Sequence, residues 1–599
     1  MIVPMKKAMI IVQSKDSDSA VANLRSLGVL HIEHQKAPSG DDIVNIKDNI
    51  SLIKESIGIL SKPEFQENDF IKEKRQVDDW KLLPKHIIDC SKRLNQLQEY
   101  SRRLINNINQ WQQWGDFAPD SIHALSNKNI YVRLYQIPTK DIKKLPTDII
   151  LKVISSQKGM AKCVIISQQK IDIPFKEASL PKMGLEKMRL RLNQDNGAID
   201  SIKNEIKKHR RYYDSLMHIN KSLEKDLEFQ EALNGMGQFG SLECLKGYIP
   251  YDKVDLLLKT ARQQNWGISI KEPSDDDRVP TLIRNPRWIS IINPVFKAIE
   301  IVPGYREFDI SLWFLLFLSV FFGMLIGDAG YGAIFFVLTF FSQIKFGKKL
   351  KDKSVFALLY LFSFCTITWG VLSGTFFGQA WLPAWIKPIL PGLRDDKNIQ
   401  SICFFIGALH LSIGHLWRAI VKLPSLAALA EFGWICVLWG AFFLAKTLIL
   451  GETFPFFGKW FFIIGPTLVV LFSSIKRNIL KGIAAGLGNL LLNLVNSFTD
   501  VVSYVRLFAV GLATVAVADA FNKMAQDIGF NSLTTTAIAT FILFVGHTLN
   551  IILGPMSVLV HGVRLNVLEF CNHIDVKWSG FAYKPLEEEY YGTSNISSV

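Results

Sequence analysis

The 599-residue sequence lacks the signatures of most nucleotide- and metal-dependent enzymes. Its seven cysteines are scattered and form no CxxC pair, so neither a zinc site nor a disulfide framework is predicted. No G-x-x-x-x-G-K-[ST] phosphate-binding loop is present. A G-x-G-x-x-G match at residues 235–240 follows a predicted helix instead of a strand, so we interpret it as a hinge and not as a dinucleotide site. The sequence therefore predicts no cofactor and no bound metal.

The N-terminus also lacks a recognisable signal peptide. The apolar stretch within residues 1–17 is short and no small-residue cleavage site follows it, so we interpret it as a strand. We therefore expect the first half of the chain to stay in the cytoplasm. We attribute the net charge of +14 to membrane topology and contact with anionic lipid, and not to nucleic acid.

Hydrophobic residues make up 49% of the chain, but they are unevenly distributed. Residues 1–300 are rich in charge, whereas residues 310–575 contain one long apolar run after another. The second region is typical of a membrane domain with several spans. The predicted fold class is an α-helical polytopic membrane domain preceded by an α+β cytoplasmic domain.

The cytoplasmic domain, predicted over residues 1–305, alternates between two kinds of pattern. Strand and helix patterns near both of its ends and again at about 120–180 predict two α/β lobes. Between them, apolar residues step by three and four as on coiled-coil helices. These residues are Ile46, Ile50, Ile53, Ile57, Leu60, Leu94, Leu97, Leu104, Ile108, Trp111, Ile199, Ile202, Ile206, Leu216, Ile219, Leu223 and Leu227. We predict an antiparallel coiled-coil hairpin with a lobe at each end; an ordinary helical domain is the alternative.

Eight membrane spans are predicted within residues 306–580. They lie near residues 311–327, 329–342, 355–376, 400–421, 432–450, 459–473, 482–524 and 534–575. We interpret Asp328 as the cap of the turn between the first two. With eight spans, the short basic loops at 345–353, 418–422 and 476–481 all lie on the cytoplasmic side, as basic loops do. The C-terminal tail, residues 581–599, then also returns to the cytoplasm.

The last two predicted spans are longer than the about 20 residues that a bilayer needs, and each carries a polar stripe. Steps of three or four place each stripe on one helix face. The stripes are Asn489, Asn493, Asn496, Asp500, Ser503 and Arg506, and then His547, Asn550, Gly554, Ser557, His561 and Arg564. Such faces meet protein or water. Asn and Ser also serve as hydrogen-bonding groups between helices, and Arg564 and Glu569 also fit helix-end positions.

Arg506 is harder to explain as a packing residue, because it lies in the middle of its apolar run. An arginine stays charged in a protein. Placing one at the centre of a bilayer costs about 2.5–3.5 kcal/mol on insertion scales. A compensating interaction is required, and we expect it to belong to the function.

Four segments carry a resemblance to the a/I subunit of V/A-type rotary ATPases. SYVRLFAVGLA, residues 503–513, resembles that family's S-Y-x-R-L-x-A-x-x-L-A signature. HGVRLNVLEF, residues 561–570, resembles its H-x-x-R-L-x-x-x-E-F signature. FFGMLIGDAGYG is similar to its first-span motif, and VPGYREFDIS is similar to its lead-in, with Ile310 and Ser311 where Pro and Thr are usual. The resemblance covers essentially the whole chain.

The resemblance implies the stator subunit of a membrane sector, which itself hydrolyses no ATP. A rotating ring of proteolipids would pass it, coupling translocation of H⁺ or Na⁺ to ATP hydrolysis or synthesis. The family's essential arginine falls on Arg506, its second arginine on Arg564 and its histidine on His561. Eukaryotic members carry an acidic residue near Gly554, so the group that relays ions here stays open. Candidates for two ion half-channels are Asp500, Ser503, Asn496, Asn493, Asn550, Ser557 and Glu569.

The resemblance also implies partners and a location. The partners would be the proteolipid (c/K) ring, peripheral-stalk subunits of the E/G type, a central-stalk subunit of the C/d type, membrane lipid and, indirectly, the catalytic ATPase sector. The location would be a prokaryotic plasma membrane. Two rival interpretations are a secondary transporter with a cytosolic regulatory domain and a purely structural anchor. The first usually shows repeated halves, which are not found here, and the second leaves Arg506 unexplained.

Overall fold

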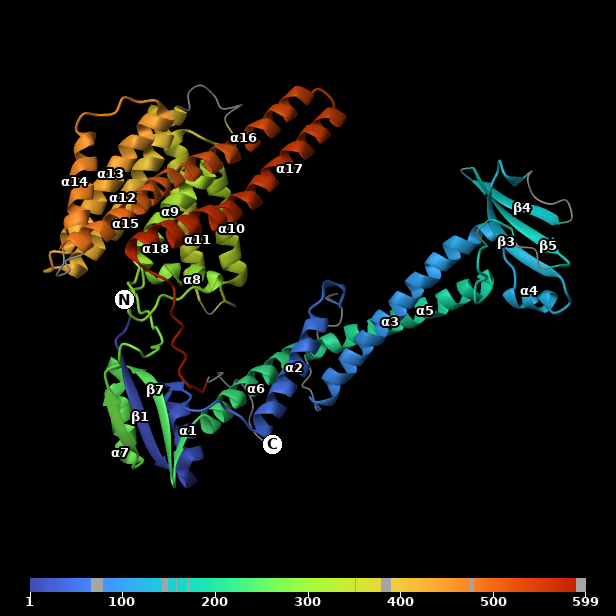
Figure 1. Cartoon of the computed structure of the whole chain (residues 1–599), viewed down its shortest axis with the longest axis horizontal. Coiled ribbons are helices and arrows are strands. Elements are labelled where there is room, and N and C mark those ends of the chain that lie inside the picture. The colour runs from blue at the N-terminus through green and yellow to red at the C-terminus, as the bar shows by residue number, and fades with distance from the viewer. Residues whose placement is uncertain are drawn as a thin grey trace. The chain divides into compact units, whose positions relative to one another are not determined.

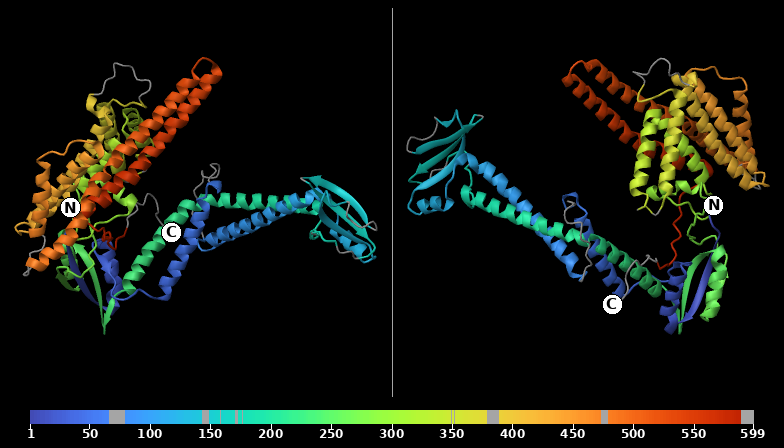
Figure 2. Two further views of the ribbon diagram at one scale, coloured as in Figure 1. Left: turned by 45° about the horizontal axis from the view of Figure 1, so that its top comes forward. Right: turned by 180° about the vertical axis from the view of Figure 1, so that it is seen from behind.

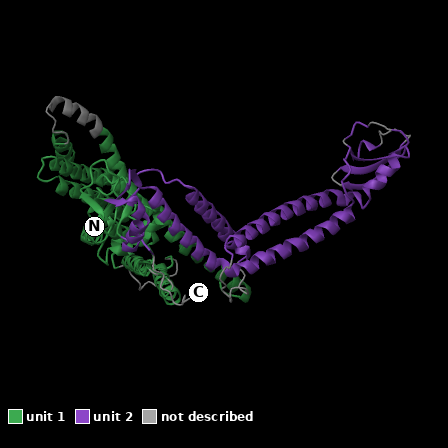
Figure 3. Cartoon of the chain, turned by 90° about the horizontal axis from the view of Figure 1, so that it is seen from below, with its two compact units in different colours: residues 1–9, 29–31, 247–585 green, residues 10–28, 32–246, 586–599 purple. Residues whose placement is uncertain are grey.

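The computed structural model describes residues 1–65, 79–142, 149–157, 159–169, 173–175, 177–348, 350, 352–378, 389–472 and 479–588, with only the backbone of residues 479–490. The predicted basic loop at 476–481 lies partly outside these residues, as do the side chain of Asn489 and the tail beyond residue 588. The chain divides into two compact units (Figure 3). One contains residues 1–9, 29–31 and 247–585, and the other contains residues 10–28, 32–246 and 586–599.

A five-stranded sheet is built from both ends of the N-terminal half. Its main path has the order β2-β7-β1-β8, and β6 pairs with β7. The strands are β1 (Met5–Gln13), β2 (His31–Glu33), β6 (Gly237–Phe239), β7 (Leu242–Pro250) and β8 (Gly267–Lys271). The helices α1 (Ser17–Leu27) and α7 (Val254–Gln263) follow the β1 and β7 strands in the chain. The sequence-based strand–helix–strand predictions at both ends are confirmed.

A second sheet forms between the long helices of the chain. It is antiparallel, with the order β3-β5-β4, and α4 (Pro119–Ser126) precedes it. The strands are β3 (Tyr131–Pro138), β4 (Ile150–Gln157) and β5 (Met160–Ser167). Val164 of the central strand β5 pairs with Leu134 of β3 on one side and with Lys152 of β4 on the other. The β4 strand has a bulge between Val153 and Ser155. Buried Tyr135, Ile137 and Cys163 form the centre of its apolar face.

Four long helices connect the sheets (Figure 1). They are α2 (Asp41–Leu60), α3 (Leu82–Trp111), α5 (Leu185–His209) and α6 (Tyr213–Asn234). Helix α3 packs against α5, and α2 packs against α6. The α3/α5 pair is antiparallel, because one cluster joins Ile87 to Ile206 and another joins Trp111 to Leu185. The predicted apolar stripes are thus the contact faces, and the coiled-coil description of this pairing stays a prediction.

The remaining helices are apolar and form one bundle (Figure 2). They are α8 (Asn293–Ile299), α9 (Ser311–Ile326), α10 (Ala329–Phe346), α11 (Ser354–Ser373), α12 (Asp396–Lys422), α13 (Ala428–Ala445), α14 (Gly458–Phe472), α15 (Ile479–Ser503), α16 (Val505–Ile528), α17 (Leu533–Ser557) and α18 (Cys571–Ile574). Among the described residues, six helical stretches are long and apolar enough to cross a membrane. They are Ala329–Phe346, Ser354–Ser373, Asp396–Lys422, Ala428–Leu450, Leu491–Ile528 and Leu533–Ile574.

The other two predicted spans are present as shorter apolar helices, α9 and α14. The count of eight spans therefore stays a prediction. Asp328 caps α10, as predicted, because its carboxylate accepts hydrogen bonds from the backbone N–H groups of Gly330 and Tyr331. Small residues allow close helix packing here: a Cβ on Gly433 of α13 would lie 2.8 Å from the carbonyl oxygen of Gly465 on α14.

The last two long stretches each depart from regular α-helix near the family motifs. The α15 and α16 helices are separated by a single turn residue, Tyr504. The α17 helix continues into two π-helical segments, Val558–Gly562 and Leu565–Phe570, before α18. Such wide turns are rare and occur frequently at functional sites. The π-helical segments overlap the second arginine-containing motif, and the interruption at Tyr504 lies in the first.

Candidate functional site

Arg506 lies in the first turn of α16, directly after the interruption at Tyr504. Its Nη2 donates to the hydroxyl oxygen of Ser503, and its Nη1 lies 3.5 Å from Oε1 of Glu569. The side chain remains 23% exposed. A guanidinium has five N–H donors, so three of them have no partner within the described part of this chain. The guanidinium is thus held by Ser503 and Glu569, while its remaining N–H groups are free to bind another group.

Glu569 is the acidic partner of both motif arginines. Its carboxylate is buried and accepts a hydrogen bond of 2.8 Å from Ser503. The same oxygen lies 3.8 Å from Nε of Arg564, whose side chain is 54% exposed. The second carboxylate oxygen is buried and has no hydrogen-bond partner among the described residues. One buried carboxylate oxygen therefore lies within ion-pair distance of two arginines, one of them half-exposed.

The π-helical turn explains how Arg564 and Glu569 come together. Five residues of a regular α-helix rotate by about 500°, which would leave the two side chains about 140° apart around the axis. The wider turn at Leu565–Phe570 reduces this separation, because each π turn holds more residues. The predicted stripe with steps of three and four therefore ends at Arg564, and Glu569 joins it through the altered helix.

His410 of α12 fixes the two motif segments relative to each other. Its ring stacks on Phe570, with centroids 4.2 Å apart and planes 12° apart. Its Nδ1 is 2.8 Å from the hydroxyl of the fully buried Tyr504. Phe570 follows Glu569 and Tyr504 follows Ser503 in the sequence. One buried histidine therefore anchors the neighbours of both groups that hold Arg506.

The remaining motif residues surround this centre. His561 is half-buried in the first π-helical segment and within electrostatic range of Arg506 and Arg564. Ser557 is the last residue of α17 and is half-buried. Gly554 faces α9, since a Cβ there would meet Cγ1 of Ile326 at 3.4 Å. Position 554 itself is a glycine and so offers no acidic side chain, unlike the corresponding region of eukaryotic members.

A chain of four ionisable groups extends from Asp500, on the α15 side of Arg506. Oδ2 of Asp500 is 3.0 Å from Nε2 of His573 on α18. Nδ1 of His573 is 2.9 Å from Nε2 of His415, and Nδ1 of His415 is 2.7 Å from Oε2 of Glu431. Four separate helices thus contribute one group each to a continuous hydrogen-bonded series.

The far end of this series carries two basic residues. Glu431 is 2% exposed, and its other oxygen lies 3.2 Å from Nη2 of Arg418 and also pairs with Lys422. The Lys422 side chain is 38% exposed, so this end reaches the surface of the bundle. A buried carboxylate with three basic partners is stable in its ionised form because its charge is balanced.

A polar cavity of about 580 Å³ adjoins the same series. Its lining includes Asn493, Asn496 and Asp500 of α15, with Asn572 and His573 of α18. The predicted stripe of the seventh span therefore faces a hollow lined by polar groups, as expected for residues that do not contact lipid.

A second polar group lies on the opposite side of Arg506. The amide of Asn550 donates to the carbonyl oxygen of Thr514 at 2.8 Å and to the hydroxyl of Tyr331 at 3.2 Å. Tyr331 in turn is 2.7 Å from Nδ1 of His547. His547 and Asn522 line a cavity of about 560 Å³ with mostly apolar walls. At 1.5 Å per residue, Asp500 is about 9 Å before Arg506 along the helix and Asn522 about 24 Å after it.

Sequence reasoning missed several residues of this site. They are His410, His415, Glu431, Tyr331 and His573. A usable signal was present, since His410, His415 and Glu431 are polar residues inside strongly apolar runs. Their pairing was not readable, because the partners are 16 to 158 residues apart in the sequence.

The fold and the site together define a membrane protein with buried, mutually compensated charges at the centre of its helix bundle. No family model matches the sequence. It is 30% identical to the "V-type ATP synthase subunit I" of Borreliella burgdorferi, over 98% of this chain and 100% of that protein. It is 28% identical to the "V-type ATP synthase subunit I 1" of Treponema pallidum, again over 98% and 100%. The chain belongs to the family of V-type and A-type ATP synthase subunit I.

More distant relatives match over part of the chain. The "A-type ATP synthase subunit I" of Methanocaldococcus jannaschii is 24% identical, over 57% of this chain and 54% of that protein. A solved structure described as the cytoplasmic N-terminal domain of subunit I, homolog of subunit a, of V-ATPase aligns with 44% of this chain and 99% of its own. Its TM-score is 0.23 at 12% identity, which is too low to carry an argument about the fold.

Replacing Glu431 tests whether the charge network supports the bundle. Glu431→Leu removes the carboxylate and leaves Arg418, Lys422 and His415 without their shared partner, so we expect a loss of about 3–5 kcal/mol of stability. The measurement is the thermal unfolding midpoint of the full chain in detergent. Glu452→Leu is the control, because its ion pair with Lys446 is half-exposed and worth about 0–1 kcal/mol. Equal midpoints for the two variants would contradict the network's structural role.

Proposed function

We propose that this chain is the stator of the membrane sector of a V/A-type ATP synthase or ATPase, with Arg506 facing the ion-binding carboxylates of a rotating proteolipid ring. Family membership supports the general role. The observation that carries the specific role is the state of the Arg506 side chain, which is tethered to Ser503 and Glu569 yet remains partly exposed with unpaired donors. A guanidinium that served packing alone would be fully paired within its own bundle.

The chemistry of the step follows from the charge of Arg506. At about 4 Å and an effective dielectric near 20, a cation attracts a carboxylate by about 4 kcal/mol. A ring carboxylate that arrives opposite Arg506 is therefore favoured in its ionised form and releases its H⁺ or Na⁺. The ring carboxylate offsets the cost of burying the arginine in return. The fixed positive charge also repels cations that would otherwise leak past it.

We assign the two polar regions beside Arg506 to two ion half-channels. One contains Asn493, Asn496, Asp500 and the cavity of about 580 Å³. The other contains Asn550, Tyr331, His547 and the cavity of about 560 Å³. Their separation along α15–α16 suits the requirement that an ion must bind the ring to pass from one to the other. The barrier between the two half-channels would be formed by His561, Ser557, Arg564 and Glu569.

The series Asp500–His573–His415–Glu431 suits the transfer of protons in the first half-channel. Carboxylates and imidazoles that are hydrogen-bonded in sequence pass protons from one group to the next without large movements. This assignment also supplies an acidic group for ion relay, which Gly554 does not.

The N-terminal domain, with its predicted boundary at residue 305, would hold the stalks of the complex. A pair of long antiparallel helices with a sheet at one end suits a mechanical role. Both termini would lie in the cytoplasm, with eight spans between them. The peripheral-stalk and central-stalk subunits are its proposed partners there, and the proteolipid ring is its proposed partner in the membrane.

Replacement of Arg506 tests the mechanism directly. Arg506→Ala should abolish ATP-driven ion transport in the assembled complex, and Arg506→Lys should also fail, because a lysine can lose its proton when desolvated. The measurement is ion uptake into vesicles after ATP addition. Lys523→Ala is the control on the same helix, since Lys523 is 64% exposed and pairs only with Asp519. Normal pumping by Arg506→Ala would exclude the mechanism.

The half-channel assignment predicts weaker transport without loss of assembly for Asp500→Asn, His561→Ala and Glu569→Gln. Each change removes a charged or proton-accepting group beside a cavity or the arginine. Initial rates of ion uptake measure the effect. Thr467→Val serves for comparison, because Thr467 is exposed on α14 and donates only to the backbone of Ile463. If all three variants transported at the rate of the unaltered chain, the assignment would be wrong.

Purification of the chain from its native membrane tests the proposed partners. We expect a small proteolipid and ATPase subunits with a phosphate-binding loop to copurify in mild detergent, as identified by mass spectrometry. A chain that purified alone and moved a solute without ATP would instead support a secondary transporter, and Arg506 would then be a substrate or counter-ion site.

A further inference from the structure

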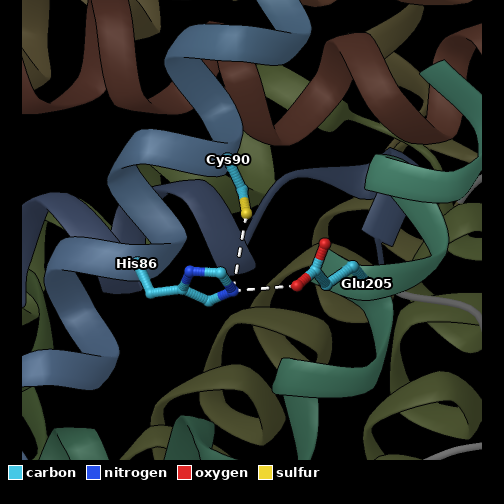
Figure 4. Close-up of side chains that lie close together, drawn as sticks. All are labelled: His86, Cys90 and Glu205. Atoms are coloured by element: carbon cyan, nitrogen blue, oxygen red, sulfur yellow. Dashed lines mark hydrogen bonds and ion pairs between the residues drawn. The ribbon is translucent and has the colours of Figure 1, made fainter. Parts of the chain in front are cut away.

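A compact group of potential metal ligands lies between α3 and α5, far in sequence from the membrane motifs (Figure 4). His86 and Cys90 come from α3, and Glu205 comes from α5. Nε2 of His86 is 2.9 Å from Oε1 of Glu205 and 3.7 Å from Sγ of Cys90. The donor atoms of the three side chains all lie within 4.8 Å of one another.

Helical spacing explains the convergence. His86 and Cys90 are four residues apart and therefore share one face of α3. Glu205 has a counterpart four residues later on α5, His209, at the last position of that helix. The two rings of His86 and His209 meet edge to face, with centroids 5.4 Å apart. The α3 helix thus presents two donors to Glu205 of α5, and His209 lies one turn further along α5 with its ring against that of His86.

His209 supplies an independent sign that a partner is missing. Its Nδ1 is buried, and no hydrogen-bond partner for it occurs among the described residues. Buried polar atoms are nearly always paired, by protein, water or ligand. The alternative without a metal is an ion pair between His86 and Glu205 beside a buried cysteine. It accounts for these three side chains, but it gives Nδ1 of His209 no partner.

The donor set and spacing suit a tetrahedral Zn²⁺ ion. Bonds of about 2.0–2.3 Å at tetrahedral angles separate the donors by about 3.3–3.7 Å. The observed separation of 3.7 Å between His86 and Cys90 lies at the upper limit of that range, and the 2.9 Å between His86 and Glu205 is slightly below it, so small side-chain rotations suffice. Nitrogen, thiolate and carboxylate ligands are those that zinc takes in proteins. A thiolate and a carboxylate together also neutralise a dication.

Access to the site is open on one side. The His86 and Glu205 side chains are 50% and 45% exposed, whereas Cys90 is buried. An ion can therefore enter from solvent and find its soft ligand at the bottom, in contact with the apolar cluster around Ile87 and Ile206.

We propose that His86, Cys90, Glu205 and His209 form a zinc-binding site that joins α3 to α5. The site lies where α3 begins and α5 ends, beside the short turn at Arg210–Tyr212 that leads into α6. Next to it, Nη1 of Arg210 donates to the carbonyl oxygen of Leu60, the last residue of α2. A metal here fixes the ends of two helices at the point where the α3/α5 and α2/α6 pairs adjoin. This inference does not depend on the proposed ion-transport function.

Metal binding by the full chain tests the proposal. The chain is purified in detergent without a histidine tag, stripped with a chelator and titrated with Zn²⁺ in competition with a chromophoric chelator. We expect one Zn²⁺ per chain, and a Kd that rises at least about 10–100-fold in Cys90→Ala and in the nearly isosteric Glu205→Gln. Titration with Co²⁺ should give the thiolate-to-cobalt absorption band, which Cys90→Ala removes.

Matched controls separate the site from general effects. Cys244→Ala removes another buried cysteine, from β7, and should leave Kd and the cobalt band unchanged. Circular dichroism and size-exclusion chromatography confirm that each variant is folded. Absence of the cobalt band in the unaltered chain, or equal Kd for it and Cys90→Ala, would overturn the site. Equal Kd for His209→Ala would remove His209 from the ligand set.

Discussion

The membrane unit depends on how one arginine is accommodated inside an apolar helix bundle. A guanidinium keeps its charge under all physiological conditions, so the surroundings must adapt to it. In this chain Glu569 and Ser503 take one edge of Arg506, while the other edge keeps unpaired donors and some exposure. Partial compensation makes the arginine tolerable in the bundle and leaves some of its donors without a partner among the described residues. Full compensation would have made it a packing residue.

The helix irregularities serve this arrangement. The interruption at Tyr504 places Ser503 and Arg506 on adjoining turns, and the wide turn of Leu565–Phe570 brings Glu569 to the side of Arg564. Both departures are anchored by the same buried side chain, His410, through a hydrogen bond to Tyr504 and a stack on Phe570. Residues of the two polar stripes then line one polar cavity and a second cavity with mostly apolar walls.

The long helices of the other unit pose a different physical problem. Their contact faces bury isoleucine and leucine side chains, which resist separation but allow sliding and bending, because apolar contacts have no direction. Hydrogen bonds or metal–ligand bonds, which have a direction, would limit this sliding most effectively at the end of a helix pair. At such an end His86, Cys90 and Glu205 converge, with the His209 ring against that of His86, and Arg210 donates a hydrogen bond to Leu60.

The sequence by itself determined the two-part organisation and most strands and helices, and it singled out Arg506, because apolar periodicity and an unpaired charge in an apolar run are local properties. It also identified Glu569 as a candidate. Only the tertiary structure decided which groups meet. The pairing of Asp500 with His573, of His415 with Glu431 and of His86 with Glu205 joins residues 16 to 119 positions apart. The α-helical period also failed beyond Arg564, where a π-helical turn changes the face that Glu569 occupies. Helix packing, which no local pattern encodes, set these contacts.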